Sequence, residues 1–200
     1  MKIIPLIYFQ KRKIYAEKDG DELSLKDLLT YVDKDAEIYV FDKDGIEGDK
    51  PNLCTYPKLS EHLKIWVDAG PRVLGDIVDE VMAGATNITV RTHLWPKADF
   101  VAIQEMIENN IYIHVDLKNR NAQDVGVPFF DAFAGLIVFN AKTQIETDFG
   151  ARDILRQFRT KNSFYAYESD PKHVSYWEKL GAGGLLVEIN KIKEFKEYGV

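Results

Sequence analysis

The sequence of 200 residues has little cysteine and no surplus of positive charge. Cys54 is its one cysteine, so the chain can form neither an internal disulfide nor a cysteine-rich metal site. The 26 Lys and Arg residues are outnumbered by 32 Asp and Glu, which gives a net charge of −6 and leaves no basic stripe for a phosphate backbone. We therefore expect no nucleic-acid partner.

Long apolar runs are also lacking. None approaches the ~20 residues that cross a bilayer, and the segment Met1–Pro5 does not continue into the apolar region of a signal peptide. These absences predict no membrane partner and a cytoplasmic location. Hydrophobic residues make up 46% and charged residues 29% of the chain, as in globular proteins, and the length suits one domain over residues 1–200.

Eight short runs rich in β-branched and aromatic residues are each bounded by Gly, Pro, Asn or charged residues, a pattern typical of strands. The runs are Lys2–Phe9, Glu37–Asp42, Lys64–Asp68, Asn87–Thr92, Ile111–Asp116, Gly135–Asn140, Ser163–Glu168 and Gly184–Asn190. Helical spacing of apolar residues lies between several of them. The predicted helices are Val73–Gly84, which ends in a C′ glycine, Lys97–Asn109, Asp148–Thr160, a short helix at 127–133 and one that begins at Asp170-Pro171.

Strands that alternate with helices predict parallel strands joined by crossovers. A closed eight-stranded barrel and an open doubly wound sheet both fit this pattern. An open sheet usually has a Gly-rich phosphate turn after its first strand, where this chain has Gln10-Lys11-Arg12. The count of eight and the near-even spacing favour an α/β fold of the single (β/α)8 TIM-barrel type with short loops.

Polar side chains collect at the C-terminal ends of the predicted strands, where barrel enzymes have their active sites. Carboxylates that converge there repel one another unless cations compensate, and Arg72 and Arg91 are candidates for that role. The candidate substrate-binding residues are Asp42, Asp68, Gly70, Arg72, Arg91, Thr92 and Asn140, and the candidate catalytic residues are Asp116, Tyr8 and Glu168.

Five segments carry a family resemblance, in chain order. They are Ile4–Phe9 (Ile-Pro-x-Ile), Lys11–Ala16 (a hairpin-like segment), Phe41–Ile46 (Asp-x-Asp-Gly), Asp68–Arg72 (a Gly-x-Arg turn) and His114–Asp116. Together they resemble the HisA/HisF-like barrels of histidine biosynthesis, the family of phosphoribosylformimino-AICAR ribotide isomerase. The resemblance implies a TIM barrel that carries out an Amadori rearrangement with one carboxylate as general acid and another as general base.

Asp116 matches one catalytic carboxylate of that family, and the other falls on Tyr8. A phenol is protonated at neutral pH, so Tyr8 can donate a hydrogen bond or act as an acid. The family also implies two phosphates held by backbone N–H groups of Gly-rich turns. Here Glu168 and Glu188 stand near two of those turns and would repel phosphate, whereas Arg91 could clamp a phosphate or a carboxylate.

The sequence therefore predicts a divergent HisA-like barrel, an isomerase or lyase that acts by acid/base chemistry on a small phosphorylated or carboxylated metabolite. The interpretation implies a small anionic partner, no cofactor and no metal, and leaves a homo-oligomer open. The alternatives are a noncatalytic barrel that binds a metabolite or protein and, less favoured, the parent isomerase. Two further hypotheses are a Schiff-base lysine at Lys142 and a metal bound by Asp42, Asp68, Asp116 and Glu168 with His93 or His114.

Overall fold

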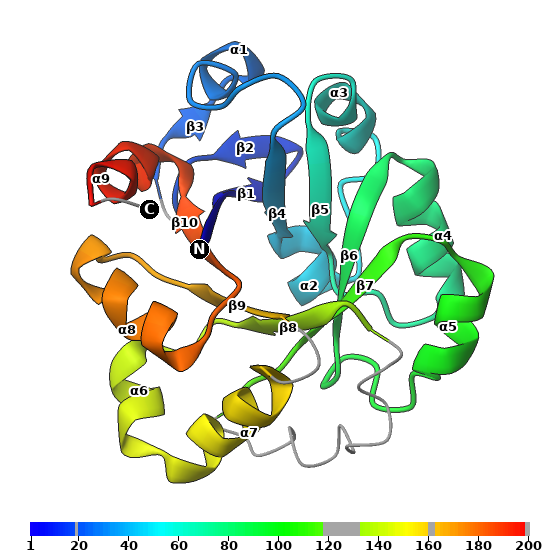
Figure 1. Ribbon diagram of the computed structural model, residues 1–200. Coiled ribbons are helices and arrows are strands. Elements are labelled where there is room, and N and C mark those ends of the chain that lie inside the picture. The colour runs from blue at the N-terminus through cyan, green and yellow to red at the C-terminus, as the bar shows by residue number, and fades with distance from the viewer. Residues whose placement is uncertain (19, 118–132, 160–162, 199–200) are drawn as a thin grey trace.

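The computed structural model describes residues 1–18, 20–117, 133–159 and 163–198. Its strands form one sheet in the order β10-β9-β8-β7-β6-β5-β4-β1-β2-β3, and β10 also pairs with β1 (Figure 1). The strands that close the barrel are β1 Lys2–Gln10, β4 Glu37–Asp42, β5 Lys64–Asp68, β6 Ala85–Arg91, β7 Asn110–His114, β8 Gly135–Val138, β9 Ser163–Tyr167 and β10 Gly184–Glu188. This is the predicted (β/α)8 TIM barrel.

The closure depends on β1, which is parallel to both of its barrel neighbours. Leu6 lies opposite Tyr39 of β4, and Lys2 lies opposite Gly184 of β10. Parallel strands are covered on both faces and therefore consist of near-continuous apolar runs, as Ile3–Phe9 does. All eight predicted strands are present, and each ends within two residues of the predicted position.

A small antiparallel extension lies beside the barrel. Strand β2 Lys13–Tyr15 pairs with the end of β1, and β3 Glu22–Leu23 pairs with β2. The β1–β2 hairpin is very tight, because Gln10 lies opposite Lys13 and only Lys11 and Arg12 form the turn.

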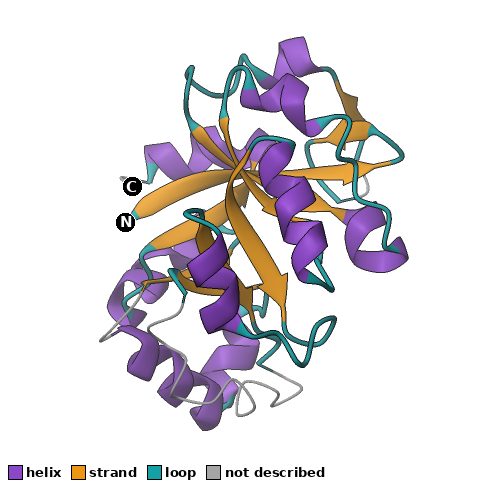
Figure 2. Ribbon diagram, turned by 90° about the vertical axis from the view of Figure 1, so that its right-hand side faces the viewer, coloured by secondary structure: helices purple, strands orange, loops and turns teal. Residues whose placement is uncertain are grey.

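Helices surround the strands on the outside, as the side view shows (Figure 2). They are α1 Leu25–Leu28, α2 Lys43–Gly48, α3 Tyr56–Ser60, α4 Leu74–Met82, α5 Phe100–Met106, α6 Lys142–Thr147, α7 Phe149–Arg159, α8 Val174–Leu180 and α9 Ile192–Glu197, with 3-10 turns η3 Pro171–His173 and η4 Ile189–Lys191. The predicted helices correspond to α4, α5, α7 and η3–α8, whereas 127–132 of the short predicted helix lies outside the described residues. Within the described ranges, no helix combines the length and apolar composition needed to cross a membrane.

The alternation of side chains along the strands creates two cores. One lies between the barrel and the helices and contains side chains such as Ile7, Val40 and Val67. The other fills the barrel interior and is unusually aromatic. Its buried members are Ile4, Leu6, Tyr8, Tyr39, Trp66, Tyr112, Ile137 and Leu186. The ring centroids of Trp66 and Tyr112 are only 3.8 Å apart, so the interior is packed and is not a pore.

Candidate functional site

The site lies at the C-terminal mouth of the barrel, where each strand presents one inward residue beyond the aromatic core. Because side chains alternate, the residue two positions beyond each inward core residue also faces inward. We apply this rule to one inward residue of the interior on each strand, namely Leu6, Tyr39, Trp66, Thr89, Tyr112, Ile137, Tyr165 and Leu186. The inward residues at the mouth are then Tyr8, Phe41, Asp68, Arg91, His114, Phe139, Tyr167 and Glu188. Of the predicted site residues, Tyr8, Asp68 and Arg91 therefore belong to the mouth.

A buried ion pair forms the floor of the mouth. Arg91 donates from Nε to Oδ1 of Asp68 at 2.8 Å and from Nη2 to Oδ2 at 2.6 Å. The Asp68 side chain is fully buried and that of Arg91 is 8% exposed. This bidentate geometry holds the guanidinium rigidly, and the strength of the pair is increased by the low dielectric around it.

Hydroxyl and indole groups of the barrel interior form a hydrogen-bond chain that ends on Asp68. The Tyr39 hydroxyl donates to Oδ2 of Asp68 at 2.7 Å and lies 3.2 Å from the Thr89 hydroxyl, which accepts from Nε1 of Trp66 at 2.9 Å. Burial and the charge of Asp68 raise the pKa of Tyr39 well above its usual value. Tyr39 therefore remains protonated and serves as a permanent donor to Asp68.

Aromatic rings cover the guanidinium. The Cζ atom of Arg91 lies 5.0 Å from the ring centroid of Phe41 and 5.9 Å from that of Phe139. Phe139 in turn stacks on Tyr167 at 5.6 Å between centroids. These contacts keep water away from Arg91 and add cation–π attraction. Phe139 and Tyr167 were not among the predicted site residues, although strand alternation alone would have placed them here.

His114 lies next to Arg91 in the β6–β7 register and is 7% exposed. In the described part of the chain its Nδ1 atom has no hydrogen-bond partner. Burial, followed by the charges of Arg91 and His93, lowers the pKa of His114 well below its usual value. The imidazole is therefore neutral at physiological pH, and the ring of His93 lies 6.3 Å away, between centroids, on the solvent side.

Tyr8 occupies the opposite part of the mouth, on β1. Its hydroxyl donates to Oε1 of Glu188 at 3.4 Å, and Oε2 of Glu188 is 2.9 Å from Nζ of Lys191. Burial, Tyr167 and Glu188 all raise the pKa of Tyr8. Burial and Glu188 raise the pKa of Tyr167 to about 12. Both phenols are therefore proton donors, and neither acts as a base.

Asp116 follows β7 at the edge of the mouth and is half-buried. Its neighbours Val115 and Leu117 both pack into the outer core. Oδ1 of Asp116 accepts from Nδ2 of Asn140 at 3.3 Å, and Oδ1 of Asn140 accepts from the Leu117 N–H at 3.1 Å. Asn140 thus joins the ends of β7 and β8 and positions Asp116.

Asp42 points away from the mouth, because it alternates with Phe41. Its carboxylate accepts from the N–H of Gly45 at 3.1 Å, from the N–H of Asn52 at 2.6 Å and from the Tyr56 hydroxyl. Burial raises the pKa of Asp42 above its usual value, and these hydrogen bonds offset only part of the rise. Asp42 therefore organises the loop after β4.

Glu168 also points outward, because it alternates with Tyr167. One oxygen accepts from the N–H groups of Ser169 at 2.8 Å and Asp170 at 2.9 Å. The other accepts from Nε1 of Trp177 at 2.8 Å and lies 3.1 Å from Nδ1 of His173. Both of its oxygens are thus engaged in anchoring η3 and α8.

The predicted binding residues Gly70, Arg72 and Thr92 lie in the loops above β5 and β6. The Arg72 guanidinium donates to the carbonyl oxygens of Gly45, Ile46 and Gly70 and to Oδ1 of Asp49 at 2.7 Å. Arg72 thus joins α2 and its C-terminal end to the loop after β5. Gly70 has φ +68°, and Thr92 is half-buried in the turn after β6.

Carboxylates of the chain itself occupy the backbone N–H groups at several helix starts around the mouth. Asp76 accepts from Arg72 at 2.8 Å and Val73 at 3.0 Å, ahead of α4. Asp99 caps α5 through Ala102 at 3.1 Å, and Asp170 caps η3. After β5, β6 and β9, where the family resemblance implies phosphate grips, these donors are already used.

The residues of the Schiff-base lysine hypothesis and of the metal-site hypothesis do not come together in the mouth. Lys142 lies on α6, with its Nζ 3.0 Å from Oε1 of Glu146 and 5.2 Å from the ring centroid of Tyr176. Asp42 and Glu168, two of the proposed metal ligands, face outward. Across the described ranges, no three His, Cys, Asp or Glu side chains are grouped so that they could share a metal ion.

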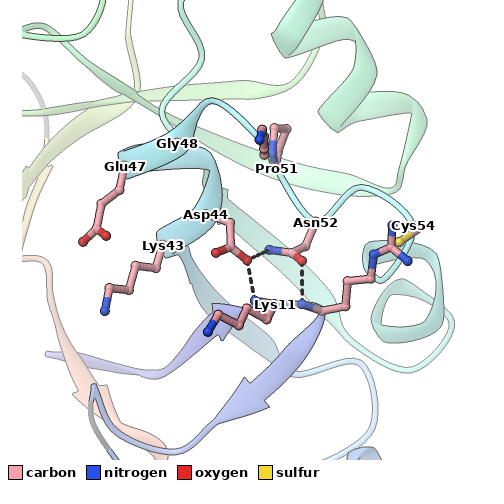
Figure 3. A pocket seen from close by; sticks show the side chains of 10 residues that line it. Lys11, Lys43, Asp44, Glu47, Gly48, Pro51, Asn52 and Cys54 are labelled. Atoms are coloured by element: carbon pink, nitrogen blue, oxygen red, sulfur yellow. Dashed lines mark hydrogen bonds between the residues drawn. The ribbon is translucent and has the colours of Figure 1, made fainter.

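A separate pocket of about 520 Å³ lies at the edge of the same face, between the β1–β2 turn and α2 (Figure 3). Its lining includes Lys11, Arg12, Lys43 and Lys50. From the sequence, Lys11 and Arg12 were residues in place of a Gly-rich turn and the start of a hairpin-like segment, and neither was predicted to bind a ligand. The four basic residues are spread over the β1–β2 turn, α2 and the loop after α2, so they form no compact motif in the sequence.

Comparison with known proteins identifies the fold and no family. No protein-family model and no curated protein matches the sequence. Among solved structures, a protein described as CdNal from Clostridium difficile in complex with mannosamine has a TM-score of 0.59 and 16% sequence identity, over 99% of this chain and 79% of that one. This similarity confirms the TIM barrel and lends no support to the HisA-like resemblance.

Proposed function

We propose that this barrel is an isomerase or lyase that acts by acid/base chemistry on a small anionic metabolite at its C-terminal mouth. The observation that carries the proposal is the set of groups with fixed protonation states around the mouth. Arg91 is a rigid buried cation, Tyr8 is a protonated phenol, and His114 is a neutral imidazole. A donor, an acceptor and a cation in one barrel mouth are the requirements of proton transfer next to a carbonyl or carboxylate.

The proposed ligand is a carboxylate or a phosphate monoester and not a bis-phosphate. Asp68 already compensates the charge of Arg91, so the floor of the mouth offers little net positive charge. The helix starts after β5, β6 and β9 are capped by the chain's own carboxylates. A second phosphate would have to displace them, which argues against the parent ribotide isomerase.

In this proposal Asp116 is the proton acceptor and Tyr8 the hydrogen-bond donor. The resemblance to HisA-like barrels suggests both positions, and the half-buried carboxylate of Asp116, held by Asn140 at the edge of the mouth, supports the first. Glu168 has no part in the chemistry here, since its oxygens anchor η3 and α8.

Proton exchange with solvent tests the proposal without knowledge of the full reaction. The protein is incubated in D₂O with a panel of 2-oxo acids, hydroxy acids and ketose or aldose monophosphates, and loss of C–H signals is followed by proton NMR. We expect exchange with at least one class, and at least a 100-fold loss of the rate in Asp116→Asn. The control is Asp33→Asn, an exposed residue before β4 at the opposite end of the barrel.

Two results would overturn the catalytic assignment. Equal exchange rates in Asp116→Asn and the wild type would remove Asp116 from the chemistry. Binding of a panel compound without exchange in any variant would favour the noncatalytic barrel, an alternative supported by the engagement of Glu168 away from the mouth.

A further inference from the structure

We propose that the pocket between the β1–β2 turn and α2 binds a phosphate-bearing small molecule. The pocket is separate from the Arg91–Asp68 floor of the mouth, and its lining residues come from the turn, α2 and the loop after α2. This inference does not depend on the proposed function. It assigns a binding site to residues that have no role in the chemistry proposed for the mouth.

The charge of the lining supports an anionic ligand. The lining includes four cations, Lys11, Arg12, Lys43 and Lys50, but only two carboxylates, Asp44 and Glu47. This local excess of positive charge occurs in a chain whose net charge is −6. Within the described ranges none of the four cations is within ion-pair distance of a carboxylate. Their charges thus remain available to a ligand.

The backbone of the turn supports the same conclusion. Lys11 and Arg12 have φ values of +50° and +64°, in the left-handed region that favours Asn and Gly. Two-residue hairpin turns with positive φ at both positions strongly prefer Asn-Gly. This chain has two long basic side chains there, so it accepts steric cost at both positions. Strain of this kind is typical of functional positions.

Hydrogen bonds hold the strained turn against the pocket wall. The Lys11 N–H donates to the carboxylate of Asp44, and the Arg12 N–H donates to Oδ1 of Asn52 at 2.9 Å. Nδ2 of Asn52 donates to Asp44 at 3.0 Å and to the buried Asp42 at 2.8 Å. Figure 3 shows this link, with Lys11 and Lys43 extending the same way from it. The basic side chains are thus presented from a fixed backbone.

The size and polarity of the pocket indicate the class of ligand. A volume of about 520 Å³ lies within the range of small-molecule sites, which is ~300–1,000 Å³. It exceeds the space that a free phosphate fills, so the ligand would have a polar organic part as well. Lysine and arginine are the side chains that bind phosphate oxygens.

Isothermal titration calorimetry at constant ionic strength tests the site, with inorganic pyrophosphate, glycerol 3-phosphate and glycerol as probes. We expect both phosphate compounds to bind and glycerol to give no heat. Lys43→Gln should weaken pyrophosphate binding at least fivefold. The control Lys193→Gln, an exposed cation on α9, should bind as the wild type does.

The double variant Lys11→Asn/Arg12→Gly separates function from folding. It installs the preferred turn residues, so we expect its melting temperature to rise by a few degrees while pyrophosphate affinity falls at least tenfold. Unchanged affinity in this variant, or no pyrophosphate binding by the wild type, would overturn the proposal. Asp116→Asn should bind pyrophosphate normally, so failure at this pocket is distinguishable from failure at the mouth.

Discussion

Arg91 and Asp68 are opposite charges in a barrel interior from which water is largely excluded, and their value to the protein depends on each other. The desolvation cost of each is offset only by the partner, by Tyr39 and by the rings of Phe41 and Phe139. In the proposed function this rigid cation serves ligand binding, and the same arrangement makes the fold sensitive to any change in either partner.

Removal of one charge should therefore lower the free energy of unfolding far more than removal of both charges. Arg91→Met leaves Asp68 buried and unpaired, and we expect it to lower the free energy of unfolding by about 3–5 kcal/mol. The double variant Asp68→Asn/Arg91→Met keeps an acceptor for Tyr39 and should recover most of this loss. Urea unfolding measures both. A loss below about 1 kcal/mol in the single variant would contradict the picture of a mutually dependent pair.

The buried His114 makes the stability of the fold dependent on pH. Its pKa in the folded protein lies well below 6.5, whereas the unfolded chain has a pKa of about 6.5. Below that pH the unfolded state binds a proton that the folded state does not bind, so stability falls as pH falls. For this group the loss is at most about 1.4 kcal/mol per pH unit.

The variant His114→Gln should remove that contribution. Urea midpoints measured from pH 7.5 to pH 5.0 should fall more steeply for the wild type than for the variant. Parallel curves would show that His114 has the same pKa in the folded and unfolded states. His114 would then not stay neutral below pH 6.5, which would contradict the neutral acceptor proposed for the mouth.

At the scale of single elements, the strands could be predicted because their composition alone separates them from the loops. Glu37–Asp42 and Lys64–Asp68 are present with the predicted bounds. The site was less predictable. The position of a residue at a strand end shows that it lies at the C-terminal end of the barrel, but it does not show whether the side chain points into the barrel or out toward the helices. Phe41 and Asp42 are neighbours in sequence, yet one covers Arg91 and the other organises a loop.

Period-two alternation from the core residues would have resolved this difference, since it separates Tyr167 from Glu168 and Phe139 from Asn140. The hydrogen bonds that engage Arg72 lay beyond any sequence argument. They depend on three carbonyl oxygens, two from α2 and one from the loop after β5, which meet only in the folded chain.

Gly75 within α4 and Gly84 just after its end allow a matched test of element stability. Gly84 follows the helix with φ +104°, and a Cβ atom there would lie 2.7 Å from Cβ of Ser60. Gly75 lies within α4, where a Cβ atom would meet nothing within 4 Å. We expect Gly84→Ala to destabilise by at least about 1 kcal/mol and Gly75→Ala to stabilise by up to about 1 kcal/mol. Thermal unfolding distinguishes the two, and shifts of equal sign would contradict this reading of the helix end.

At the scale of the whole molecule, closure of the barrel depends on small residues beneath the aromatic interior. A Cβ atom on Gly184 would lie 2.8 Å from the Lys2 carbonyl oxygen and 2.9 Å from a ring carbon of Tyr165. Gly135 is equally crowded, against the carbonyl oxygen of Ser163. These positions leave room for the large rings of the layer above.

Gly184→Val should therefore strain the seam between β1 and β10. We expect a loss of about 1–3 kcal/mol or more in the free energy of unfolding, because overpacking forces backbone shifts at the strand pair that closes the barrel. Urea unfolding gives the loss. Hydrogen exchange should show faster opening of β1 and β10 than of β5 and β6, and uniform protection across the barrel would contradict a local effect at the seam.

The capping of the helix starts by the chain's own carboxylates has a consequence for how this scaffold could change over evolution. Asp42, Asp99 and Asp170 each cap the helix or 3-10 turn that follows their own strand. The loop of one such unit could therefore change without removing a hydrogen-bond partner from the next unit. The same arrangement closes the usual route by which barrels acquire a phosphorylated substrate, through bare helix starts. New specificity in this lineage would arise by exchange of the inward side chains at the mouth, one strand at a time.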